Sequence, residues 1–509
     1  MSDKFFFNAL VSVSDKTGLK EFLKPLVDKG LRVVSTGGTA KYLKANGIPV
    51  VEVGEQTGFP EVMDGRVRTL HPKIHMALLA RRENAQDMKL LKEHSLEPFD
   101  LVIGNLYPFA SYKDTDLTER ELSEYIDIGG PALLRAAAKN YEQTTVVCDP
   151  HDYHWILSDG GTSLEQRKKL ASKVFAHISS YDSMVANHLN AEDFTKEEIT
   201  YSAEVVQSLR YGENPQQKAV WLRSKGKNHG LHNAKILQGK TLSYNNILDL
   251  NATLDVVTLF KEPTCVAVKH NNPCGVASGK TIFEAVSKAL KADSTSVFGG
   301  IVALNNDVDA KCAEELSKVF LECIIAPRFD ENALKILEVK KNLRLLEYDF
   351  SLHKKESEVR SISGGLLFQS ADVVSLEWDR NWKIYGEEPS QYIKKDLLFA
   401  WKVCSALKSN AIAIVENELS LGLGMGQVSR IDSVYHAIER MKKYHPNFKT
   451  PVLASDAFFP FEDSIEIAAQ NGIRWVIQPG GSVKDEQVIS AAQKLNVNMI
   501  FTGVRHFRH

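Results

Sequence analysis

Two short polar loops near the start of the chain combine hydroxyl-bearing, small and cationic residues of the kind that hold a phosphate group. Ser12–Gly18 (SVSDKTG) includes Lys16 and lies where an apolar run gives way to a helical pattern, and Ser35–Thr39 (STGGT) has the same setting. Free backbone N–H groups at a helix start favour an anion, and paired glycines let the backbone approach it closely. Two such loops at matching positions favour a phosphate site over the alternative, two ordinary N-capped helices. Neither matches GxxxxGK[ST], so ATP is not implied.

Two further segments of the first half concentrate cationic side chains. Gly65–Pro72 (GRVRTLHP) contains two arginines, a threonine and a histidine. Ile126–Pro131 (IDIGGP) opens a helical pattern on which an arginine and Lys139 share a face at i, i+4. Taken alone, the first segment is as typical of a solvated basic loop as of a site, and the second is typical of a surface helix.

In the second half, Lys269–Gly275 (KHNNPCG) follows an apolar strand pattern. Lys269 and His270 place a cation beside a group that exchanges protons near neutral pH. Zinc deaminases carry HxE followed by PCxxC, but here Ala277 takes the place of the second cysteine and no HxE precedes it. We therefore expect no structural or catalytic zinc. Taken alone, a single histidine near a strand is more often part of a core than of a site.

Metal-dependent hydrolysis remains an alternative because two pairs of histidines have helical spacing. His71 and His75 are at i, i+4, and His506 and His509 are at i, i+3. There is no HExxH motif, and such spacings arise often by chance, so this alternative is disfavoured.

The elements that must position these residues follow an α/β pattern. In the first half, strand patterns at 7–13, 31–34, 101–105 and 144–147 alternate with helical patterns at 18–29, 39–46 and 131–140, and two long helical patterns follow near 164–191. This rhythm predicts a parallel sheet with helices on both faces. The charged stretch Asn190–Ile199 is the candidate linker.

The second half alternates less regularly but also indicates α/β structure. Strands are predicted at 265–269, 301–304, 412–416 and 475–478, and helices at 282–292, 310–320, 433–444, 464–471 and 485–495. We expect two α/β lobes divided near residues 360–390.

Composition sets the broad class. The chain has 509 residues, 62 basic and 64 acidic side chains and a formal net charge of −2, so no basic excess indicates nucleic acid or a membrane surface. No apolar stretch reaches the roughly 18 residues of a membrane helix, and no signal peptide is recognisable. None of the six cysteines forms a CxxC pair. A cytoplasmic protein is the default expectation.

The first-half segments, with NLYPF and DIGGPALLRAAAKN, resemble the IMP cyclohydrolase domain of the bifunctional enzymes of purine synthesis over about residues 8–150. The resemblance implies a methylglyoxal-synthase-like parallel-sheet domain. It implies that the nucleotide is bound by Ser14, Asp15, Lys16, Thr36, Gly37, Gly38 and Thr39. The resemblance also places a second group of residues around the reacting base: Arg66, Val67, Arg68, Thr69, Asn105, Tyr107, Asp127, Ile128 and Lys139. Of these, Lys139 is the acid/base candidate.

From about residue 200 to the end, the chain resembles AICAR transformylase, which is built of two cytidine-deaminase-like lobes without their metal. The segments that carry this resemblance are LRYGENPQQKA, LSYNNILDLNA, SVFGGIVALN, GLGMGQVSRIDSV, SDAFFPFEDSI, PGGSVKDE and TGVRHFRH. It implies that His270 is the proton acceptor, Lys269 its catalytic neighbour and Asn410 the residue that orients substrate or oxyanion. It assigns the AICAR phosphate to Arg210 and Tyr211. Further ligand-binding positions are Gly299, Glu322, Arg430, Phe458, Asp463, Gly480, Gly481 and Arg505.

The resemblance implies one enzyme with two activities. Residues 199–509 would transfer a formyl group from 10-formyltetrahydrofolate, as cosubstrate, to AICAR, and residues 1–198 would close the product FAICAR to IMP with loss of water. The family forms homodimers with transformylase sites at the subunit interface. It implies no catalytic metal and leaves a bound monovalent cation open. Another alternative is a non-enzymatic, regulatory nucleotide-binding module, against which Lys269–Gly275 and the matching second half argue.

Three positions depart from the family pattern. Arg68 stands where a lysine is usual, Gln216 where an NPHQ form has histidine, and Met76-Ala77 where two glycines often follow HPKIH. Arg68 cannot accept a proton, which favours an electrostatic role. Gln216 argues against a transformylase mechanism with a second imidazole.

Overall fold

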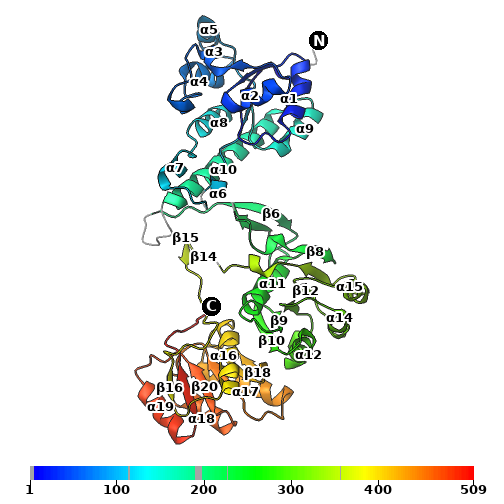
Figure 1. Cartoon of the computed structure of the whole chain (residues 1–509), viewed down its shortest axis with the longest axis vertical. Helices are drawn as coiled ribbons and strands as arrows, with labels where there is room; N and C mark the ends of the chain where they lie inside the picture. The colour runs from blue at the N-terminus through cyan, green and yellow to red at the C-terminus, as the bar shows by residue number, and fades with distance from the viewer. Residues whose placement is uncertain (1–4, 113–114, 190–197, 226, 356) are drawn as a thin grey trace. The chain divides into compact units, whose positions relative to one another are not determined.

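The computed structural model describes residues 5–112, 115–189, 198–225, 227–355 and 357–509 (Figure 1). Contacts within the chain divide these residues into two units. Unit 1 comprises residues up to 204 together with 224–225, and unit 2 comprises 205–223 and the described residues from 227 to the end. The boundary at 198/199 stays a prediction, because most of the candidate linker Asn190–Ile199 lies outside the described residues.

Unit 1 is built on a five-stranded parallel sheet in the order β3-β2-β1-β4-β5, which confirms the predicted parallel sheet. Strands buried on both faces consist of nearly continuous apolar runs, and the runs at the centre of this sheet are of that kind. The strands are β1 (Asn8–Ser12), β2 (Arg32–Ser35), β3 (Val51–Glu52), β4 (Leu101–Gly104) and β5 (Thr145–Val147).

Helices cover both faces of this sheet because successive residues of a strand point to opposite sides. Leu10 joins one core, and its neighbours Ala9 and Val11 join the other. The first core is covered by α4 (Pro72–Leu79), α8 (Gly129–Lys139) and α10 (Leu164–Leu189). The second is covered by α1 (Leu19–Asp28), α2 (Gly37–Ala45) and α9 (Tyr153–Ser158).

Helix α10 corrects one prediction, because the two helical patterns expected near 164–191 form a single helix of 26 residues. The remaining elements of unit 1 are short. They are α3 (Val53–Thr57), α5 (Ala85–Glu93), α6 (Phe109–Tyr112), α7 (Glu119–Ser123) and the 3₁₀ turns Met63–Gly65 and Pro150–Asp152.

Unit 2 is built on a twelve-stranded mixed sheet in the order β16-β21-β20-β19-β17-β18-β10-β9-β11-β12-β13-β8. Its first half consists of β8 (Lys235–Gln238), β9 (Thr264–Lys269), β10 (Asn272–Ser278), β11 (Ile301–Leu304), β12 (Cys323–Ala326) and β13 (Arg344–Glu347). Its second half consists of β16 (Lys383–Tyr385), β17 (Ile412–Glu416), β18 (Leu419–Gly424), β19 (Val452–Ser455), β20 (Trp475–Gln478) and β21 (Asn498–Phe501).

The two halves repeat one arrangement. Read outward from the β10–β18 seam, β10-β9-β11-β12-β13-β8 corresponds strand for strand to β18-β17-β19-β20-β21-β16. In the first half, α11 (Tyr244–Val257) precedes the β9–β10 hairpin, and α12 (Ile282–Ala292), α13 (Ser294–Val297), α14 (Ala310–Ser317) and α15 (Glu331–Leu337) follow it. In the second half, α16 (Gln391–Ser405) precedes the β17–β18 hairpin, and α17 (Arg430–Tyr444), α18 (Asp463–Gln470) and α19 (Asp485–Lys494) follow it.

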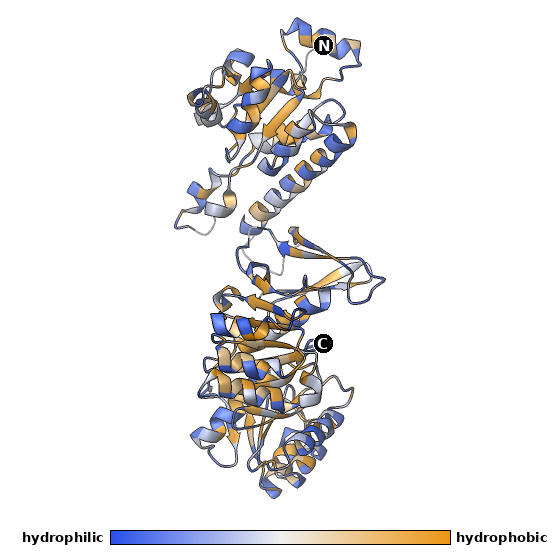
Figure 2. Cartoon of the chain, turned by 90° about the vertical axis from the view of Figure 1, so that its right-hand side faces the viewer, coloured by the Kyte–Doolittle hydropathy of each residue, from blue (hydrophilic) through white to orange (hydrophobic). Residues whose placement is uncertain are grey.

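On one face of the sheet, the two lobes contribute to a single hydrophobic core. Helices α11 and α16 bury Leu254 and Trp401 in a common core that contains strand residues of both halves. Each half has a separate core on its other face. In Figure 2 the strands of the sheets are coloured mainly as hydrophobic, whereas the helices carry hydrophilic stripes. Two hairpins stand outside the sheets: β6 (Ala203–Leu209) with β7 (Ala219–Ser224), and β14 (Glu358–Ile362) with β15 (Gly365–Gln369).

None of the described helices combines the length and the apolar composition needed to cross a membrane.

Two candidate active sites

The candidate nucleotide site of unit 1 lies where β1, β2 and β4 end. The carboxyl ends of parallel strands share one edge of a sheet, so the loops after β1 and β2 meet Asn105, which follows β4. The hydroxyl oxygens of Ser12 and Thr36 are 3.1 Å apart. The Thr39 hydroxyl accepts the N–H of Val13 and donates to its carbonyl, at 3.1 and 2.9 Å. Side chains of the two predicted phosphate loops therefore hold them together.

Asn105 fixes the first loop. Its Oδ1 accepts the N–H groups of Ser14 and Asp15 at 2.6 and 2.9 Å, and its Nδ2 donates to the Asp15 carbonyl at 2.9 Å. Asp15 accepts the hydroxyl and N–H of Thr17, which lowers the pKa of its carboxyl. The Ser14 and Asp15 amides are therefore engaged and not free, which corrects that part of the prediction. Lys16, with Nζ 3.1 Å from the Ser14 carbonyl, supplies the loop's cation.

The second loop is the start of a helix. Helix α2 begins at Gly37, two residues before the predicted Thr39, so Gly37 and Gly38 belong to its first turn. The Thr36 side chain at the N-cap does not bond to that turn. The positive end of the helix dipole and its first N–H groups therefore face the loop, which suits an anion.

The Arg68 guanidinium packs against two glycines of this site. A Cβ atom at Gly65 would lie 2.0 Å from Nε of Arg68, and one at Gly37 would lie 2.8 Å from Nη1. Nε donates to Glu61 at 2.7 Å. Gly37, Glu61 and Arg68 border a cavity of about 250 Å³, whose wall also includes His71. A positive charge is thus placed beside the first turn of α2.

Asp127 stands at the start of helix α8. Its Oδ1 accepts the N–H of Gly130 at 2.7 Å, and its own N–H donates to the Tyr181 hydroxyl at 2.7 Å. Burial raises the pKa of the Asp127 carboxyl. Thr69 is buried against the first residue of this helix. Three further predicted positions have exposed side chains: Val67, Tyr107 and Ile128.

Two predicted cations lie away from this group. Lys139 is the last residue of α8, and an 11-residue helix places it about 15 Å along the axis from the end that Asp127 caps. The Arg66 guanidinium forms an ion pair with Glu124. The predicted place of Lys139 and Arg66 around the reacting base stays a prediction.

In unit 2 the predicted residues of both halves reach the same edge of the sheet. The pairing of β9 with β11 and of β11 with β12 puts Lys269, Gly299 and Glu322 on one edge. The pairs β9–β10, β10–β18 and β18–β17 are all antiparallel, so β17 begins at the edge where β9 ends. Asn410, just before β17, therefore lies on this edge too. Strands β19, β20 and β21 end there and lead to Phe458, Gly480, Gly481 and Arg505.

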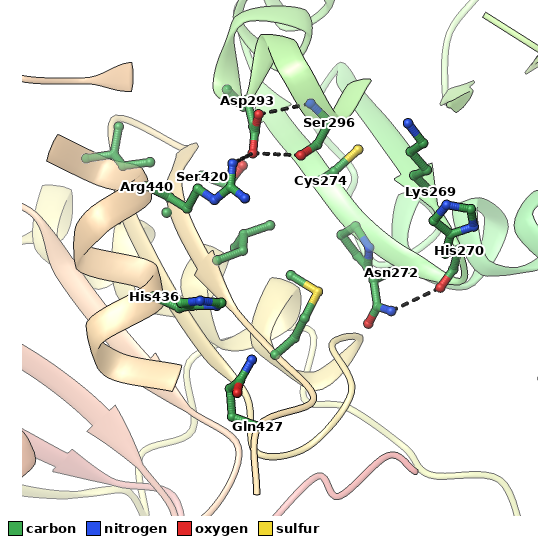
Figure 3. Close-up of a pocket in the computed structure, with 16 residues that line it drawn as sticks. Lys269, His270, Asn272, Cys274, Asp293, Ser296, Ser420, Gln427, His436 and Arg440 are labelled. Atoms are coloured by element: carbon green, nitrogen blue, oxygen red, sulfur yellow. Dashed lines mark hydrogen bonds and ion pairs between the residues drawn. The ribbon is translucent and has the colours of Figure 1, made fainter. Parts of the chain in front are cut away.

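Lys269 and His270 border a cavity of about 370 Å³ between β10 and β18 (Figure 3). The Lys269 ammonium donates to the Phe298 carbonyl at 2.8 Å, next to Gly299. Across the cavity in Figure 3 lie Gln427 and His436, which come from the second half of the sheet. The cavity therefore joins the predicted Lys–His pair of one lobe to the other lobe.

His270 lies in a two-residue hairpin turn. Lys269 pairs with Asn272, which leaves His270 and Asn271 between β9 and β10, with φ of 54° and 61°. Positive φ at both positions is the pattern of a type I′ turn, which favours Asn, Asp or Gly. Residues held in this region cost of order 1–3 kcal/mol each and collect at functional sites. The turn presents an exposed imidazole at the sheet edge.

The Asn410 side chain is fixed beside the same cavity. Its Nδ2 donates to the carbonyl of Gln427, a cavity residue, at 2.9 Å, and its Oδ1 accepts Nη2 of Arg430 at 2.8 Å. Arg430 is buried, donates to Ser455 at 2.8 Å and forms an ion pair with Asp456. The guanidinium that was expected to bind ligand is thus directed at Asn410 and at a buried carboxylate, which makes it a support for Asn410.

The other predicted positions have contacts of their own. Glu322 forms an ion pair with Arg344 at 2.9 Å. The guanidinium of Arg210 lies 4.7 Å from the ring centre of Tyr211, at an exposed position after β6. Asp463 accepts the N–H of the next residue at 2.6 Å as the first residue of α18.

The candidate metal ligands have other partners. His71 accepts the N–H of Lys73 through Nδ1 at 3.1 Å, and His506 contacts Asp372 at 2.7 Å. Burial raises the pKa of the Cys274 thiol to about 12. In the part of the chain that the structure describes, no group of three or more His, Cys, Asp or Glu residues is arranged to hold a metal ion.

Supporting residues of the unit 2 site had no predicted role. Asp249 accepts the N–H of Asn271 at 2.6 Å, and Asn272 accepts the N–H of Lys408 through Oδ1 at 3.1 Å. Asp456 is fully buried beneath Asn410. An aspartate inside a helical or strand pattern carries no spacing signal, and only the three-dimensional contacts reveal these roles.

Comparison with known proteins identifies the family. A family model described as AICARFT/IMPCHase bienzyme matches residues 137–440, and one described as MGS-like domain matches residues 18–132. The bifunctional purine biosynthesis protein PurH of Thermoanaerobacter sp. (strain X514) is 49% identical, and that of Bacillus subtilis (strain 168) is 47% identical. Each alignment covers 98% of this chain and 99% of the relative. The chain therefore belongs to the AICARFT/IMPCHase bienzyme family.

Proposed function

We propose that this bienzyme forms FAICAR from AICAR and 10-formyltetrahydrofolate in residues 199–509, and closes FAICAR to IMP in residues 1–198. The observation that carries the proposal is the sheet edge of unit 2, where Lys269 and His270 border one cavity and Asn410 donates to Gln427 in the wall of that cavity. A separate cavity, bordered by Arg68, lies at the strand ends of unit 1. Each reaction thus has its own set of side chains.

Formyl transfer needs a base and a stabilised oxyanion. The AICAR amine is a poor nucleophile because its lone pair is delocalised into the ring, so a base must take its proton as the nitrogen attacks the formyl carbon. His270 takes this proton. The bond from the formyl carbon to N10 of the folate then breaks, and N10 gains a proton supplied through Lys269. Asn410 orients the substrate or the developing oxyanion, with its amide held by Arg430.

Ring closure is intramolecular, so positioning supplies much of its rate. The carboxamide nitrogen of FAICAR attacks its own formyl carbon, and a water molecule leaves. Arg68 stabilises the oxygen that gains negative charge, since a guanidinium remains protonated and donates two hydrogen bonds. The phosphate lies on the first turn of α2 and near Lys16. We assign proton transfer to Tyr107 and to Asp127, a carboxyl whose pKa is raised by burial.

We place the transformylase sites at the interface of a homodimer. This is supported by the β14–β15 hairpin, whose residues Val359, Ile362, Leu366 and Leu367 are all exposed. A two-stranded hairpin is at best marginally stable alone in water, and large exposed apolar patches mark interaction sites. A second subunit that covers this hairpin would account for both.

Neither proposed reaction needs a metal or a redox cofactor, because side chains move all the protons. The described cysteines are free thiols, and five of the six are buried, which supports a place in the reducing cytoplasm.

The direct test is to incubate the purified protein with AICAR and 10-formyltetrahydrofolate and to follow IMP. We expect IMP and tetrahydrofolate in equal amounts, with no change after EDTA treatment. Nucleotide binding without turnover would instead support a regulatory module. Loss of activity in EDTA that zinc restores would support the metal-dependent alternative.

A further inference from the structure

The two halves of the unit 2 sheet contain the same strained turn. Between β9 and β10, His270 and Asn271 have φ of 54° and 61°. Between β17 and β18, Asn417 and Glu418 have φ of 55° and 52°. Residues other than glycine stay in this left-handed region only where their surroundings hold them. Each turn therefore needs a partner outside the hairpin.

An aspartate at the same position of the preceding helix holds each turn. Asp249 is the sixth residue of α11 and accepts the N–H of Asn271 at 2.6 Å. Asp396 is the sixth residue of α16 and accepts the N–H groups of Asn417 and Glu418 at 2.9 and 2.7 Å. The two halves of the sheet thus repeat not only the strand order but also the aspartate that accepts backbone N–H groups of the hairpin turn.

Neither aspartate serves its own helix. The sixth residue is too far along a helix to act as its N-cap, and aspartate is a weak helix former in a helix interior. Asp249 is half-buried, and burial raises the pKa of its carboxyl while hydrogen bonds from the backbone of His270 and Asn271 lower it. The hydrogen bonds from the turn explain why an aspartate, and not a better helix former, occupies position 249.

We propose that Asp249 is a positioning residue for formyl transfer, whose carboxylate holds the His270–Asn271 turn in its left-handed conformation and so directs the His270 imidazole. The inference rests on the proposed role of His270 as proton acceptor. Asn272 adds to the hold, because its Nδ2 donates to the His270 carbonyl at 3.0 Å. The matching turn held by Asp396 carries no histidine and lies at the opposite edge of the sheet.

The test compares Asp249→Ala with the matched control Asp396→Ala in the full-length enzyme. For Asp249→Ala we expect kcat of formyl transfer to fall roughly 10²-fold, the scale of a small misplacement of a catalytic group, with KM for AICAR within about twofold. Closure of supplied FAICAR should be unchanged. Asp396→Ala loses the same kind of contact, so it should lower Tm at least as much but keep formyl transfer within about threefold.

A second substitution separates conformation from charge. Glycine adopts positive φ without strain, so Asn271→Gly in the Asp249→Ala chain should restore kcat to within roughly fivefold of the starting enzyme. Hydrogen exchange gives a readout independent of activity. Amides of a peptide covering residues 265–275 should exchange faster in Asp249→Ala, and should stay fast in the rescued double variant because the acceptor is still absent. If Asp249→Ala does not fold, Asp249→Asn, which keeps one acceptor oxygen, takes its place with the same rescue.

Three results would overturn the proposal. One is an unchanged kcat in Asp249→Ala although the turn exchanges faster, and another is a lack of rescue by Asn271→Gly. The third is an equal loss of formyl transfer in Asp396→Ala, which would indicate a general effect of stability. His270→Ala, measured in the same assays, separates the proposed role of Asp249 from the proposed role of His270. Full formyl transfer in that variant would show that His270 is not the base, independently of the result for Asp249.

Discussion

The two candidate sites use side chains in different ways. In unit 1, Arg68 is fitted between two glycines beside a helix start, and its charge is permanent. In unit 2, His270 is a titratable group on a strained turn, held by contacts from a helix. Ring closure within one molecule needs position and charge, whereas transfer between two molecules also needs a base. The difference between the sites follows the difference between the reactions.

The largest effect that separates the sites is expected for His270→Ala. Loss of a general base typically costs 10²–10⁴-fold, roughly, in rate. Formyl transfer should fall by this amount, and closure of supplied FAICAR should remain within about twofold, as steady-state assays of each half-reaction would show. Survival of formyl transfer within a few-fold would remove His270 as the base.

Arg68→Leu tests the unit 1 site and its proposed role in ring closure. We expect kcat of ring closure to fall roughly 10²–10³-fold, the scale of removing one oxyanion donor, with formyl transfer unchanged. Arg68→Lys should keep substantial closure activity, because the charge survives although the planar fork is lost. A wild-type closure rate in the leucine variant would show that Arg68 is only a solvated loop residue.

Gly65→Ala asks whether the glycine contact places Arg68. A Cβ there would lie 2.0 Å from Nε of Arg68, so the guanidinium must move, and we expect ring closure to fall roughly 10- to 100-fold. Gly47→Ala is the matched control. Gly47 has a similar positive φ, but a Cβ there meets nothing within 4 Å. Equal losses in the two variants would point to backbone strain instead of displacement of Arg68.

The sequence predicted a strand correctly where the strand is a continuous run of apolar residues. Apolar runs predicted four of the five strands of unit 1, all but the two-residue β3. The Lys–His pair of unit 2 was predicted at a strand end, and β9 ends at Lys269. Strand β18 was missed, since its glycines are typical of a loop. A Cβ at Gly422 or Gly424 would lie 2.0 or 1.9 Å from a carbonyl oxygen of α17, so these glycines let that helix pack on the strand. Gly275 has the same relation to α12.

Charged groups were harder to place than strands. Lys139 ends helix α8, at the end opposite to Asp127, and Arg66 pairs with Glu124, so their predicted place around the reacting base stays a prediction. Arg430 was expected to meet ligand and is buried on Asp456. Such outcomes depend on contacts between segments far apart in sequence, which neither periodicity nor motif spacing contains.

Dilution should distinguish the two activities if only one site is shared between subunits. Specific activity of formyl transfer should fall a few-fold as the proposed dimer dissociates, and ring closure should change less. Activity assays alongside light scattering or sedimentation over the same concentrations would show this. Equal specific activities across the monomer–dimer transition would contradict shared transformylase sites.

The smallest effect concerns the stability of unit 1 in acid. Burial lowers the pKa of His177 from the usual 6.5 to about 4, and its Nε2 is buried without a partner. Between these pH values the unfolded chain binds the proton and the folded unit does not, so stability falls as the pH falls. From pH 7 to pH 5 the loss should be at most about 2 kcal/mol. Urea titrations should show a smaller loss for His177→Gln, and no such change for the exposed control His151→Gln.

The central claim is that each unit carries one reaction on its own residues. Its most direct test is to supply Arg68→Leu and His270→Ala enzymes separately with AICAR and 10-formyltetrahydrofolate, and to separate FAICAR and IMP by chromatography. We expect the Arg68 variant to accumulate FAICAR in step with tetrahydrofolate, and the His270 variant to make neither product yet to convert added FAICAR to IMP. Loss of both reactions in either variant would contradict the division.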